Sequence, residues 1–589
     1  MSNILFGTNR QFTLERLPFS IEGAYLSVYQ SITDKNLYFS LCRSEDAGLA
    51  RPNPIRIIPM FEGDELPFIY ECDAAKLTVS TKYGTAEFTY EAADIMRIRV
   101  RGITLRFDYV PLMHEGGVER FPGEVEIAFN LLGKLLFKHI SGNMTNTAKW
   151  NFRQVSPYPF VIDVSPEGDN HGEIAIHEYY SNGVANESYI PFDAAYEKTL
   201  AAFEKYCENY PEVPIQYRDM AERAIWVVWQ SRLGPEGGQK GLKDVAVYMH
   251  KLFLIRAFGW QQCFHAMALA DNAKEAVRLL LTLFHYQDKE GGIPDNASDL
   301  AQYNYISTKP PLYGFACCYM LDNFDTSGLT EDDYTQLYDK LSRFTNWWFK
   351  HHDHAKTGYP SYYHPDESGY DEATLFEGGL PIQSPDLLAY IVMLCEACSR
   401  LAEKLEDTVN AEFWMAESTR VLDYLVNDLW DGKQFRAKLV ATGEYFECGS
   451  VALLQAAMLG KRLPRDILHT IALRISDPNE FLTDYGIATE NLQSPFHAQR
   501  SFTRGPVVAP TNALILLGLF DGGETEIART ICVRYLNALL AEGLALAVSP
   551  FRKEPASGDD IVKMNTGMSV SFPFTSWAAS IFLALASKI

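Results

Sequence analysis

The chain has 589 residues and a formal net charge of −23, from 52 basic and 75 acidic side chains. Nucleic acids and anionic membrane surfaces bind positively charged proteins, so this balance excludes both classes as expected partners. Hydrophobic residues make up 47% of the chain, which is ordinary for a globular protein and too much for a disordered one.

The apolar segments of the sequence are too short for a membrane-spanning helix. The longest of them, residues 507–520, is interrupted by Pro510, Thr511 and Asn512. The first 20 residues lack a basic stretch followed by an apolar one. We therefore expect no secretory signal and a cytoplasmic protein.

The cysteines predict no disulfide framework. Only ten occur in the chain, and Cys317–Cys318 and Cys395–Cys398 lie within apolar helical patterns. We expect these thiols to be buried and reduced.

A period of two predicts strands in the first third of the chain. Residues 77–80 and 85–90 alternate around a turn, and residues 95–107 alternate apolar side chains with Arg97 and Arg99. Similar short segments, separated by proline and glycine, recur to about residue 190. With no helical patterns between them, they predict an antiparallel β-sandwich of half-buried strands.

From about residue 195 the period changes to 3.6, which predicts helices. The expected organisation is a β-sandwich over residues 1–195, a linker helix over 196–215 and a helical domain over 216–589. Twelve helices fit six helical hairpins that close into a ring with an inner and an outer layer. The predicted fold class is therefore α+β, a β-sandwich followed by an (α/α)6 barrel. The twelve expected helices are 217–233, 257–270, 272–287, 310–323, 331–350, 384–404, 408–428, 449–459, 464–476, 511–519, 523–543 and 574–587.

Two helix starts carry local signals. Thr330 and Asp333 have the spacing of a capping box, and Ser384 precedes a proline, so its hydroxyl is expected to cap the next helix.

Three loops rich in glycine, proline and carboxylates lie between the helices, at residues 308–314, 364–386 and 485–506. Loops of this kind on a rigid scaffold often hold a functional site. The three histidines in residues 351–354 do not converge on one ion from a helix end, so no metal site is predicted. Phosphate-binding and dinucleotide-binding glycine motifs are absent from the sequence, and we expect no cofactor.

Short motifs follow one another along the helical region: Trp260-x-x-Cys263-Phe264-x-Ala266, Gln287-Asp288-x-x-Gly291, Lys309-Pro-Pro-x-x-Gly314, Ser368-Gly-Tyr-Asp371, Ser384-Pro-Asp-Leu387, Arg504-Gly-Pro506, Asn565-Thr-Gly567 and Phe574-Thr-Ser-Trp577. In this order they resemble glycoside hydrolase family 63, especially its bacterial mannosylglycerate-hydrolase-like branch. The resemblance covers about residues 215–589 and implies a trehalase-like (α/α)6 toroid, often preceded by a β-sandwich.

The resemblance implies hydrolysis of a glycosidic bond with inversion by two carboxyl groups. The general acid of the family corresponds to Asp371, which would need a partly desolvated, aromatic setting to stay protonated. Tyr370, with Tyr362, Tyr363 and Phe376, could line that setting. The nearby carboxylates of Glu367, Glu372 and Asp366 would also disfavour ionisation of Asp371 if they face the same pocket.

The general base of the family is a glutamate shortly before the last Thr-Gly motif. An ungapped count places Asp560 at this position, and Glu554 is the alternative if residues 555–560 are an insertion. Both carboxylates stay open as the base.

Other positions depart from the family pattern. Gln261 stands where the family has an aspartate that faces the sugar, and Thr503 and Val508 stand where it has tryptophans. Gln261 can still hydrogen-bond hydroxyl groups, but it carries no charge. These changes predict a different sugar or a wider pocket.

Further substrate contacts are implied at four positions. Lys309 and Arg504 are expected to make polar contacts, and Lys309 would suit an acidic aglycone such as glycerate. Trp260 and Tyr313 would stack against a sugar face, with ordinary core packing as the alternative. Glu490 is expected to order its loop rather than to catalyse.

The leading hypothesis is a cytoplasmic, exo-acting, inverting hydrolase of a small α-glycoside, either an α-glucoside or an α-mannoside. Its expected partner is a small oligosaccharide or glycoside, and a homo-oligomer stays open. The alternatives are a disaccharide phosphorylase and a noncatalytic sugar-binding relative.

Overall fold

The computed structural model describes residues 5–7, 12–43, 55–112, 114–130, 132–149, 158–168, 170–235, 241–300, 303–498, 501–548 and 574–589. The chain forms two compact units, which are described separately. The first contains Met1–Glu208, Trp226–Gly234 and Tyr248–Arg256, and the second contains Asn209–Ile225, Pro235–Val247 and Ala257–Ile589. Helix α1 (Phe192–Cys207) packs on strand β8 and belongs to the first unit. Residue 195, where the boundary was expected, therefore lies inside this helix.

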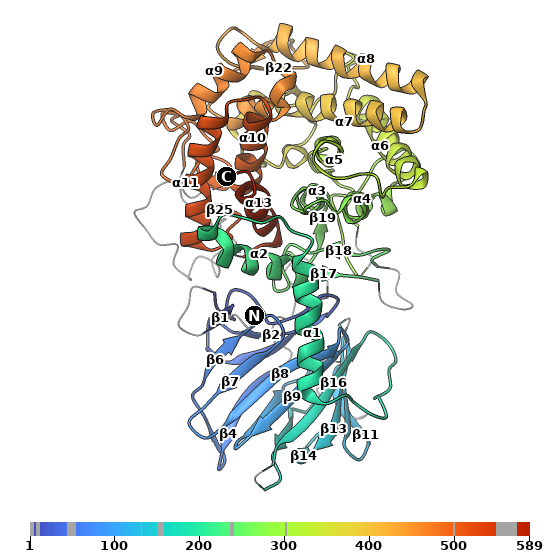
Figure 1. The fold of residues 1–589 in the computed structure, drawn as a ribbon, viewed down its shortest axis with the longest axis vertical. Helices are drawn as coiled ribbons and strands as arrows, with labels where there is room; N and C mark the ends of the chain where they lie inside the picture. The colour runs from blue at the N-terminus through green and yellow to red at the C-terminus, as the bar shows by residue number, and fades with distance from the viewer. Residues whose placement is uncertain are drawn as a thin grey trace. The chain divides into compact units, whose positions relative to one another are not determined.

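Two antiparallel sheets build the first unit (Figure 1). In spatial order, the nine-stranded sheet contains β1 (Phe6–Gly7), β6 (Ile69–Cys72), β7 (Leu77–Ser80), β8 (Thr85–Ala92), β9 (Ile95–Arg101), β16 (Gly172–Tyr179), β13 (Gly133–Ser141), β12 (Glu124–Phe129) and β11 (Gly116–Phe121). The seven-stranded sheet contains β14 (Asn143–Asn146), β15 (Phe160–Ser165), β10 (Thr104–Tyr109), β4 (Ile55–Phe61), β3 (Leu37–Leu41) and β2 (Leu26–Gln30), with β5 (Asp64–Glu65) paired to β4.

Aromatic side chains from both sheets form the core between them. The ring of Phe137 on β13 meets the rings of Phe39 and Phe107 from the other sheet at centroid distances of 6.5 and 5.2 Å. Such interlocking inner faces define a β-sandwich, and this part of the predicted fold is confirmed.

Strand β9 is buried on both faces, whereas its sequence pattern predicted a half-buried strand. Arg97 and Arg99 retain only 2% and 8% of their surface. Arg97 pairs with Glu173, while Arg99 bonds to Asp193 on α1 (2.9 Å) and stacks over the ring of Phe192. The start of helix α1 thus covers Arg99, and each buried guanidinium has an acidic partner.

Each of the twelve expected helices coincides with a helix in the structure. They are α2 (Arg218–Gln230), α3 (Gly259–Met267), α4 (Ala273–Leu281), α5 (Tyr313–Asn323), α6 (Glu331–His351), α7 (Pro385–Lys404), α8 (Thr408–Tyr424), the 3-10 helix η6 (Val451–Arg462), α9 (Arg465–Ile475), α10 (Ala509–Asp521), α11 (Thr525–Glu542) and α13 (Ser576–Ala586). Short helices and strands lie in the connections: η1 (Ile215–Tyr217), β17 (Arg232–Leu233), β18 (Ala246–Val247), β19 (Ala257–Phe258), η2 (Leu283–Tyr286), β20 (Asn296–Ala297), η3 (Pro365–Ser368), η4 (Thr374–Gly378), β21 (Ile382–Gln383), the π-helix η5 (Leu425–Leu429), β22 (Ala437–Leu439), β23 (Tyr445–Phe446), β24 (Val507–Val508) and β25 (Ala547–Val548).

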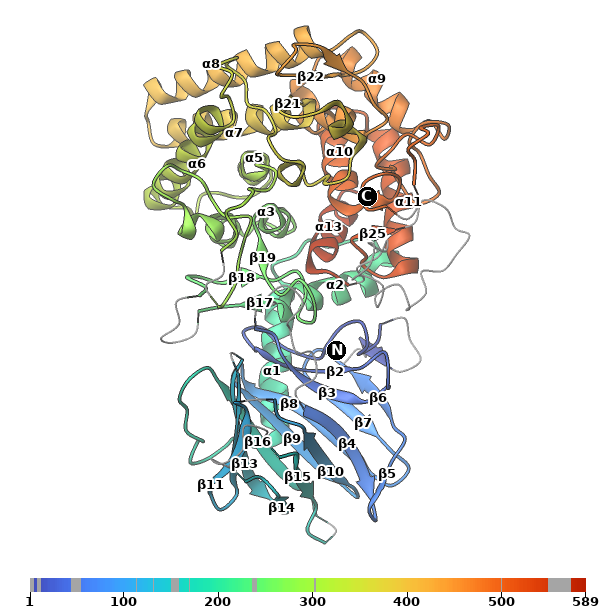
Figure 2. The ribbon, with the colours of Figure 1, turned by 180° about the vertical axis from the view of Figure 1, so that it is seen from behind.

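Six of these helices close into a ring within the second unit. In ring order, α3, α5, α7, η6, α10 and α13 each pack on the next, and α13 packs back on α3. Helices α4, α6, α8, α9 and α11 pack on these inner helices as an outer layer (Figures 1 and 2). The structure therefore confirms the predicted fold class.

Glycines allow the inner helices to approach closely. A Cβ on Gly314 of α5 would lie 2.3 Å from the backbone nitrogen of Leu394 on α7, and a Cβ on Gly518 of α10 would lie 2.1 Å from the carbonyl oxygen of Ala457 on η6. A side chain at either position would push the two backbones apart.

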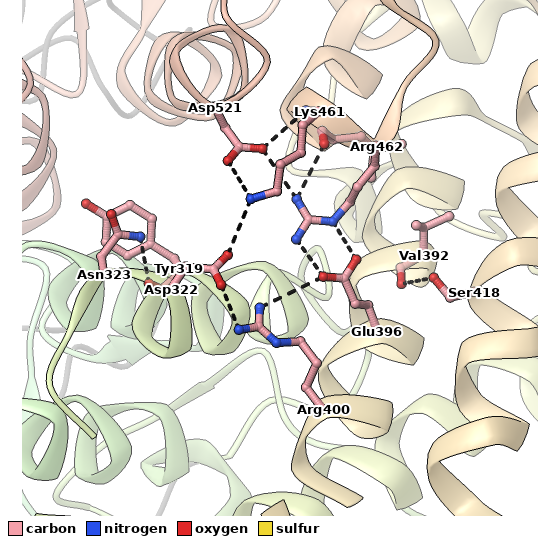
Figure 3. Close-up of polar contacts among 11 residues, drawn as sticks. Tyr319, Asp322, Asn323, Val392, Glu396, Arg400, Ser418, Lys461, Arg462 and Asp521 are labelled. Atoms are coloured by element: carbon pink, nitrogen blue, oxygen red, sulfur yellow. Dashed lines mark hydrogen bonds and ion pairs between the residues drawn. The ribbon is translucent and has the colours of Figure 1, made fainter. Parts of the chain in front are cut away.

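Charged side chains join the inner helices near their C-terminal ends (Figure 3). Arg462 Nη2 of η6 bonds Glu396 Oε1 of α7 at 2.6 Å, and Arg400 of α7 bonds Asp322 of α5 at 2.6 Å. Lys461 Nζ lies 3.1 Å from Asp521 Oδ1 at the end of α10. The network thus connects α5, α7, η6 and α10.

One of the two expected helix caps is confirmed and the other is wrong. Thr330 and Asp333 exchange the two hydrogen bonds of a capping box at α6. Helix α7 begins after Ser384 as expected, but the Ser384 hydroxyl donates to the Asp386 carboxylate rather than capping the backbone.

Over the described ranges, we find no helix both long enough and apolar enough to cross a lipid bilayer.

We predict that Glu396→Ala lowers the free energy of unfolding by about 2–3 kcal/mol. The guanidinium group of Arg462 is largely buried, and the substitution removes its main partner. Denaturant titration of both proteins measures the change. The control is Glu290→Ala, which removes an exposed pair with Lys350 and should leave the midpoint nearly unchanged. Equal midpoints for wild type and Glu396→Ala would contradict the prediction.

Candidate active site

The loop that holds Asp371 is shaped by its own residues. Helix η3 begins with Pro365 after His364, and the carboxylate of Glu367 accepts hydrogen bonds from the amides of Tyr363 and His364 (2.8 and 3.2 Å). Gly369 ends this helix at φ 71°, in the left-handed region that favours glycine. We call residues 364–378 the acid loop.

Asp371 is largely buried within this loop. Among the residues that the structure describes, its Oδ1 has no hydrogen-bond partner. Burial raises the pKa of the Asp371 carboxyl above its ordinary value, and the nearby charges of Asp366 and Glu372 raise it further, while Lys309 lowers it. This setting favours a protonated carboxylic acid, which a general acid requires.

Lys309 lies beside the acid loop, as the motif order suggested. Its half-buried ammonium group donates to the carbonyl oxygen of Asp366 at 3.1 Å. The structure therefore brings Lys309 and Asp371 into one site, although they are 62 positions apart in the sequence.

Two of the three tyrosines expected to line the acid direct their hydroxyl groups into the ring of helices, whereas the hydroxyl group of Tyr363 accepts from the amide of His354. Tyr370 Oη donates to Gln455 Oε1 on η6 and lies 2.8 Å from Thr511 Oγ1 on α10. Tyr362 Oη donates to Asp386 at the start of α7 (2.9 Å). Tyr370 thus attaches the acid loop to η6 and α10, and Tyr362, just before the loop, attaches the chain to α7.

Trp260 packs against the acid loop. A Cβ on Gly369 would lie 2.4 Å from the Trp260 ring, so the ring and the loop backbone are in direct contact. The other side of the indole packs edge-on against Trp577, with centroids 4.5 Å apart. Only 7% of Trp260 is exposed, and its stacking on a sugar stays a prediction.

Gln261 and Tyr313 are buried in the helix ring. Gln261 has no exposed surface, and its amide nitrogen donates to Ser576 Oγ of α13 at 2.8 Å. Tyr313 is 2% exposed and packs edge-on against Phe284 and Phe344. For Tyr313 this is the core packing that the sequence left open as the alternative. Contact of Gln261 or Tyr313 with substrate stays a prediction.

Arg504 binds the acid loop. Its Nε donates to the carbonyl oxygen of Glu372 at 2.5 Å, and its Nη2 bonds Glu377 Oε1 at 2.6 Å. The contact with substrate expected for Arg504 stays a prediction.

Glu490 is fully buried beside the same loop. Its two carboxylate oxygens accept from Thr374 (2.8 Å) and Ser494 (2.6 Å), and burial raises the pKa of the carboxyl group. The hydrogen bond to Thr374 fits the loop-ordering role expected for Glu490.

The remaining sequence predictions concern the general base and the histidines before the acid loop. The two candidate bases, Glu554 and Asp560, lie outside the described residues. Of the histidines before the acid loop, His352 bonds Glu367 at 3.0 Å. Within the described part of the chain there is no group of three metal-binding side chains.

Asp386 and Glu372 belong to the site. Asp386 appeared in the sequence only as part of a family motif, yet it is fully buried, and burial raises its pKa to about 6. The Ser-Pro-Asp helix start was the signal available for it. Glu372 was expected to act on Asp371 through its charge, as it does, but no local signal existed for its hydrogen bonds, because their partners lie about 130 positions further along the chain.

We predict that Asp386 makes stability fall as pH rises from about 4 to about 6. The raised pKa means that the folded protein keeps this proton while the unfolded chain loses it, so the stabilisation present below pH 4 is lost through pH 6. The loss amounts to about 3 kcal/mol. Asp386→Asn cannot ionise, and the difference between its stability and that of the wild type, measured by denaturant titration at each pH, isolates this contribution. A pH-independent difference would refute the prediction.

Comparisons with known proteins give a family match and matches to solved structures. A crystal structure of a glycoside hydrolase family 63 mannosylglycerate hydrolase from Thermus thermophilus in complex with glucose matches with 16% identity and a TM-score of 0.48, over 62% of this chain and 99% of that one. The same enzyme in complex with Tris matches with 17% identity and a TM-score of 0.49, at the same coverage. No curated protein matches the chain. Residues 256–560 match the family described as the mannosylglycerate hydrolase MGH1-like glycoside hydrolase domain, and because this match spans more than half of the chain, the chain belongs to that family.

Proposed function

We propose that the protein is an exo-acting, inverting hydrolase of a small α-glycoside, an α-glucoside or an α-mannoside, with Asp371 as its general acid. Membership of a glycoside hydrolase family supports the class of reaction. The observation that supports Asp371 in particular is its carboxyl group, which is largely buried, has a raised pKa and has no partner for Oδ1 among the described residues.

In the proposed reaction, protonated Asp371 gives its proton to the glycosidic oxygen as the bond to the anomeric carbon breaks, and the aglycone leaves as an alcohol. A second carboxylate takes a proton from the water that attacks the opposite face of the sugar. Inversion requires the two carboxyl groups to be about 6.5–9.5 Å apart, which leaves room for this water. We propose Glu554 or Asp560 as the second carboxylate.

The same site sets the chemistry of the ligand. The proposed reaction uses only carboxyl groups and water, so it requires no cofactor. Lys309 brings an ammonium group beside Asp371, and we propose that it contacts the polar groups of the leaving aglycone.

The test is hydrolysis of a panel of α- and β-glucosides, mannosides and galactosides, with and without inorganic phosphate. NMR identifies the anomer that forms first. We expect turnover of an α-glucoside or α-mannoside with inverted configuration, and a decrease of about 10²–10⁴-fold in kcat in Asp371→Asn. The control is Asp423→Asn, an exposed carboxylate on α8, which should match the wild type.

Other outcomes contradict the proposal in distinct ways. Turnover only with phosphate would identify a phosphorylase. Sugar binding without turnover would identify a noncatalytic relative. Unchanged activity in Asp371→Asn would remove Asp371 from the mechanism.

A further inference from the structure

We propose that Glu372 and Thr503 are positioning residues, which hold the backbone of Asp371 and so orient its carboxyl group. The inference rests on the proposed role of Asp371 as the general acid. It concerns the contact between the acid loop and the 501–504 segment, which follows about 130 residues later in the chain.

Every polar group of Glu372 is bonded to the 501–504 segment. Its amide N–H donates to Thr503 Oγ1 at 3.2 Å, and its carbonyl oxygen accepts from Arg504 Nε at 2.5 Å. Its carboxylate Oε2 accepts from Ser501 Oγ (2.7 Å) and from the amide of Phe502 (3.3 Å). The residue that follows the acid is thus fixed through both its backbone and its side chain.

The residue that precedes the acid is fixed as well. The amide of Tyr370 donates to Ser368 Oγ at 2.9 Å, and its hydroxyl group reaches Gln455 and Thr511 in the helix ring. The Trp260 ring lies against Gly369. Asp371 therefore lies between two neighbours that are both anchored.

This arrangement suits a general acid. A carboxyl group held by strong hydrogen bonds to its charged form has a lower pKa and gives up a bond with each proton transfer. Anchoring the neighbours orients Asp371 without either effect, and loss of the anchor would allow the carboxyl group to move. A displacement of about 1 Å is enough to lower a rate by about 10²-fold.

Glu372 also acts on the pKa of Asp371 through its negative charge. Substitutions at Glu372 and Thr503 can separate this effect of charge from the positioning of the backbone. Its carboxylate is one of the groups that raise the pKa of Asp371. Thr503 carries no charge and is fully buried, so it contributes to position only.

The decisive variant is Thr503→Val, which removes the acceptor of the Glu372 amide while preserving shape and charge. We expect kcat to fall about 10–100-fold, with KM and the pH profile nearly unchanged. Thr503→Ser keeps the acceptor hydroxyl group and should have a kcat close to that of the wild type. The matched control is Thr345→Val, a fully buried threonine of α6 whose hydroxyl donates to the carbonyl oxygen of Leu341, which should keep the wild-type kcat.

The second variant, Glu372→Gln, keeps an acceptor oxygen and loses the charge. The general acid must be protonated, so the pKa of Asp371 sets the alkaline limb of the pH–rate profile. Loss of the neighbouring negative charge lowers that pKa, and we expect the alkaline limb to move to lower pH. Thr503→Val should leave the limb in place.

Hydrogen exchange provides a readout that does not depend on activity. The amide of Glu372 should exchange slowly in the wild type and in Thr345→Val, and faster in Thr503→Val. Equal kcat and equal exchange in wild type and Thr503→Val would overturn the positioning role while Asp371→Asn still tests the proposed reaction. A wild type inactive on all substrates would refute the proposed function, and the exchange experiment would then decide whether Thr503 holds the loop.

Discussion

The closure of the helix ring is the constraint on which the site depends. Helix α13 packs on α3 although more than 300 residues separate them, and two hydrogen-bonded contacts join them: Gln261 with Ser576 and His265 with Ser580. Because a closed ring brings the starts of distant helices together, the loops before them come together as well. The acid loop reaches η6 and α10 through Tyr370, and the chain just before it reaches α7 through Tyr362.

The fold could be predicted from the sequence because its signals are local. A period of two or 3.6 is visible within a few residues, and it identified the sandwich and all twelve expected helices. The cap at Ser384 was predicted wrongly: in the folded chain its hydroxyl group donates to the Asp386 carboxylate, and no backbone amide of α7 donates to it. The burial of Arg99 was missed because its partner Asp193 lies on α1, about 100 residues further along the chain, and that of Arg97 because its partner Glu173 lies on β16.

Side-chain roles in the site were less predictable for the same reason. The motif order led to Asp371 and Lys309, which the structure brings together. It also suggested that Gln261 and Tyr313 contact a substrate, which stays a prediction, and both side chains are buried in the ring. A motif shows that a residue is near a site, but its direction depends on neighbours such as Ser576 that belong to another helix. Glu372 has all its partners in a distant segment, so only the folded chain reveals its role.

Two opposing electrostatic effects meet at the proposed acid. Burial and the carboxylates of Asp366 and Glu372 raise the pKa of Asp371, and the ammonium group of Lys309 lowers it. The net effect raises the pKa, so this carboxyl group keeps its proton to higher pH than a free aspartic acid, as a general acid requires. In the proposed account, the anchored neighbours decide where the proton is presented.

The most direct test of Asp371 as the general acid compares leaving groups. Two glycosides that share the sugar hydrolysed by the wild type are given to Asp371→Asn, one with a simple alkyl alcohol as aglycone and one with dinitrophenol. A dinitrophenolate departs without protonation, so the variant should lose most of its activity on the alkyl glycoside and little on the dinitrophenyl glycoside. An equal loss on both substrates would contradict the role of Asp371 as the proton donor.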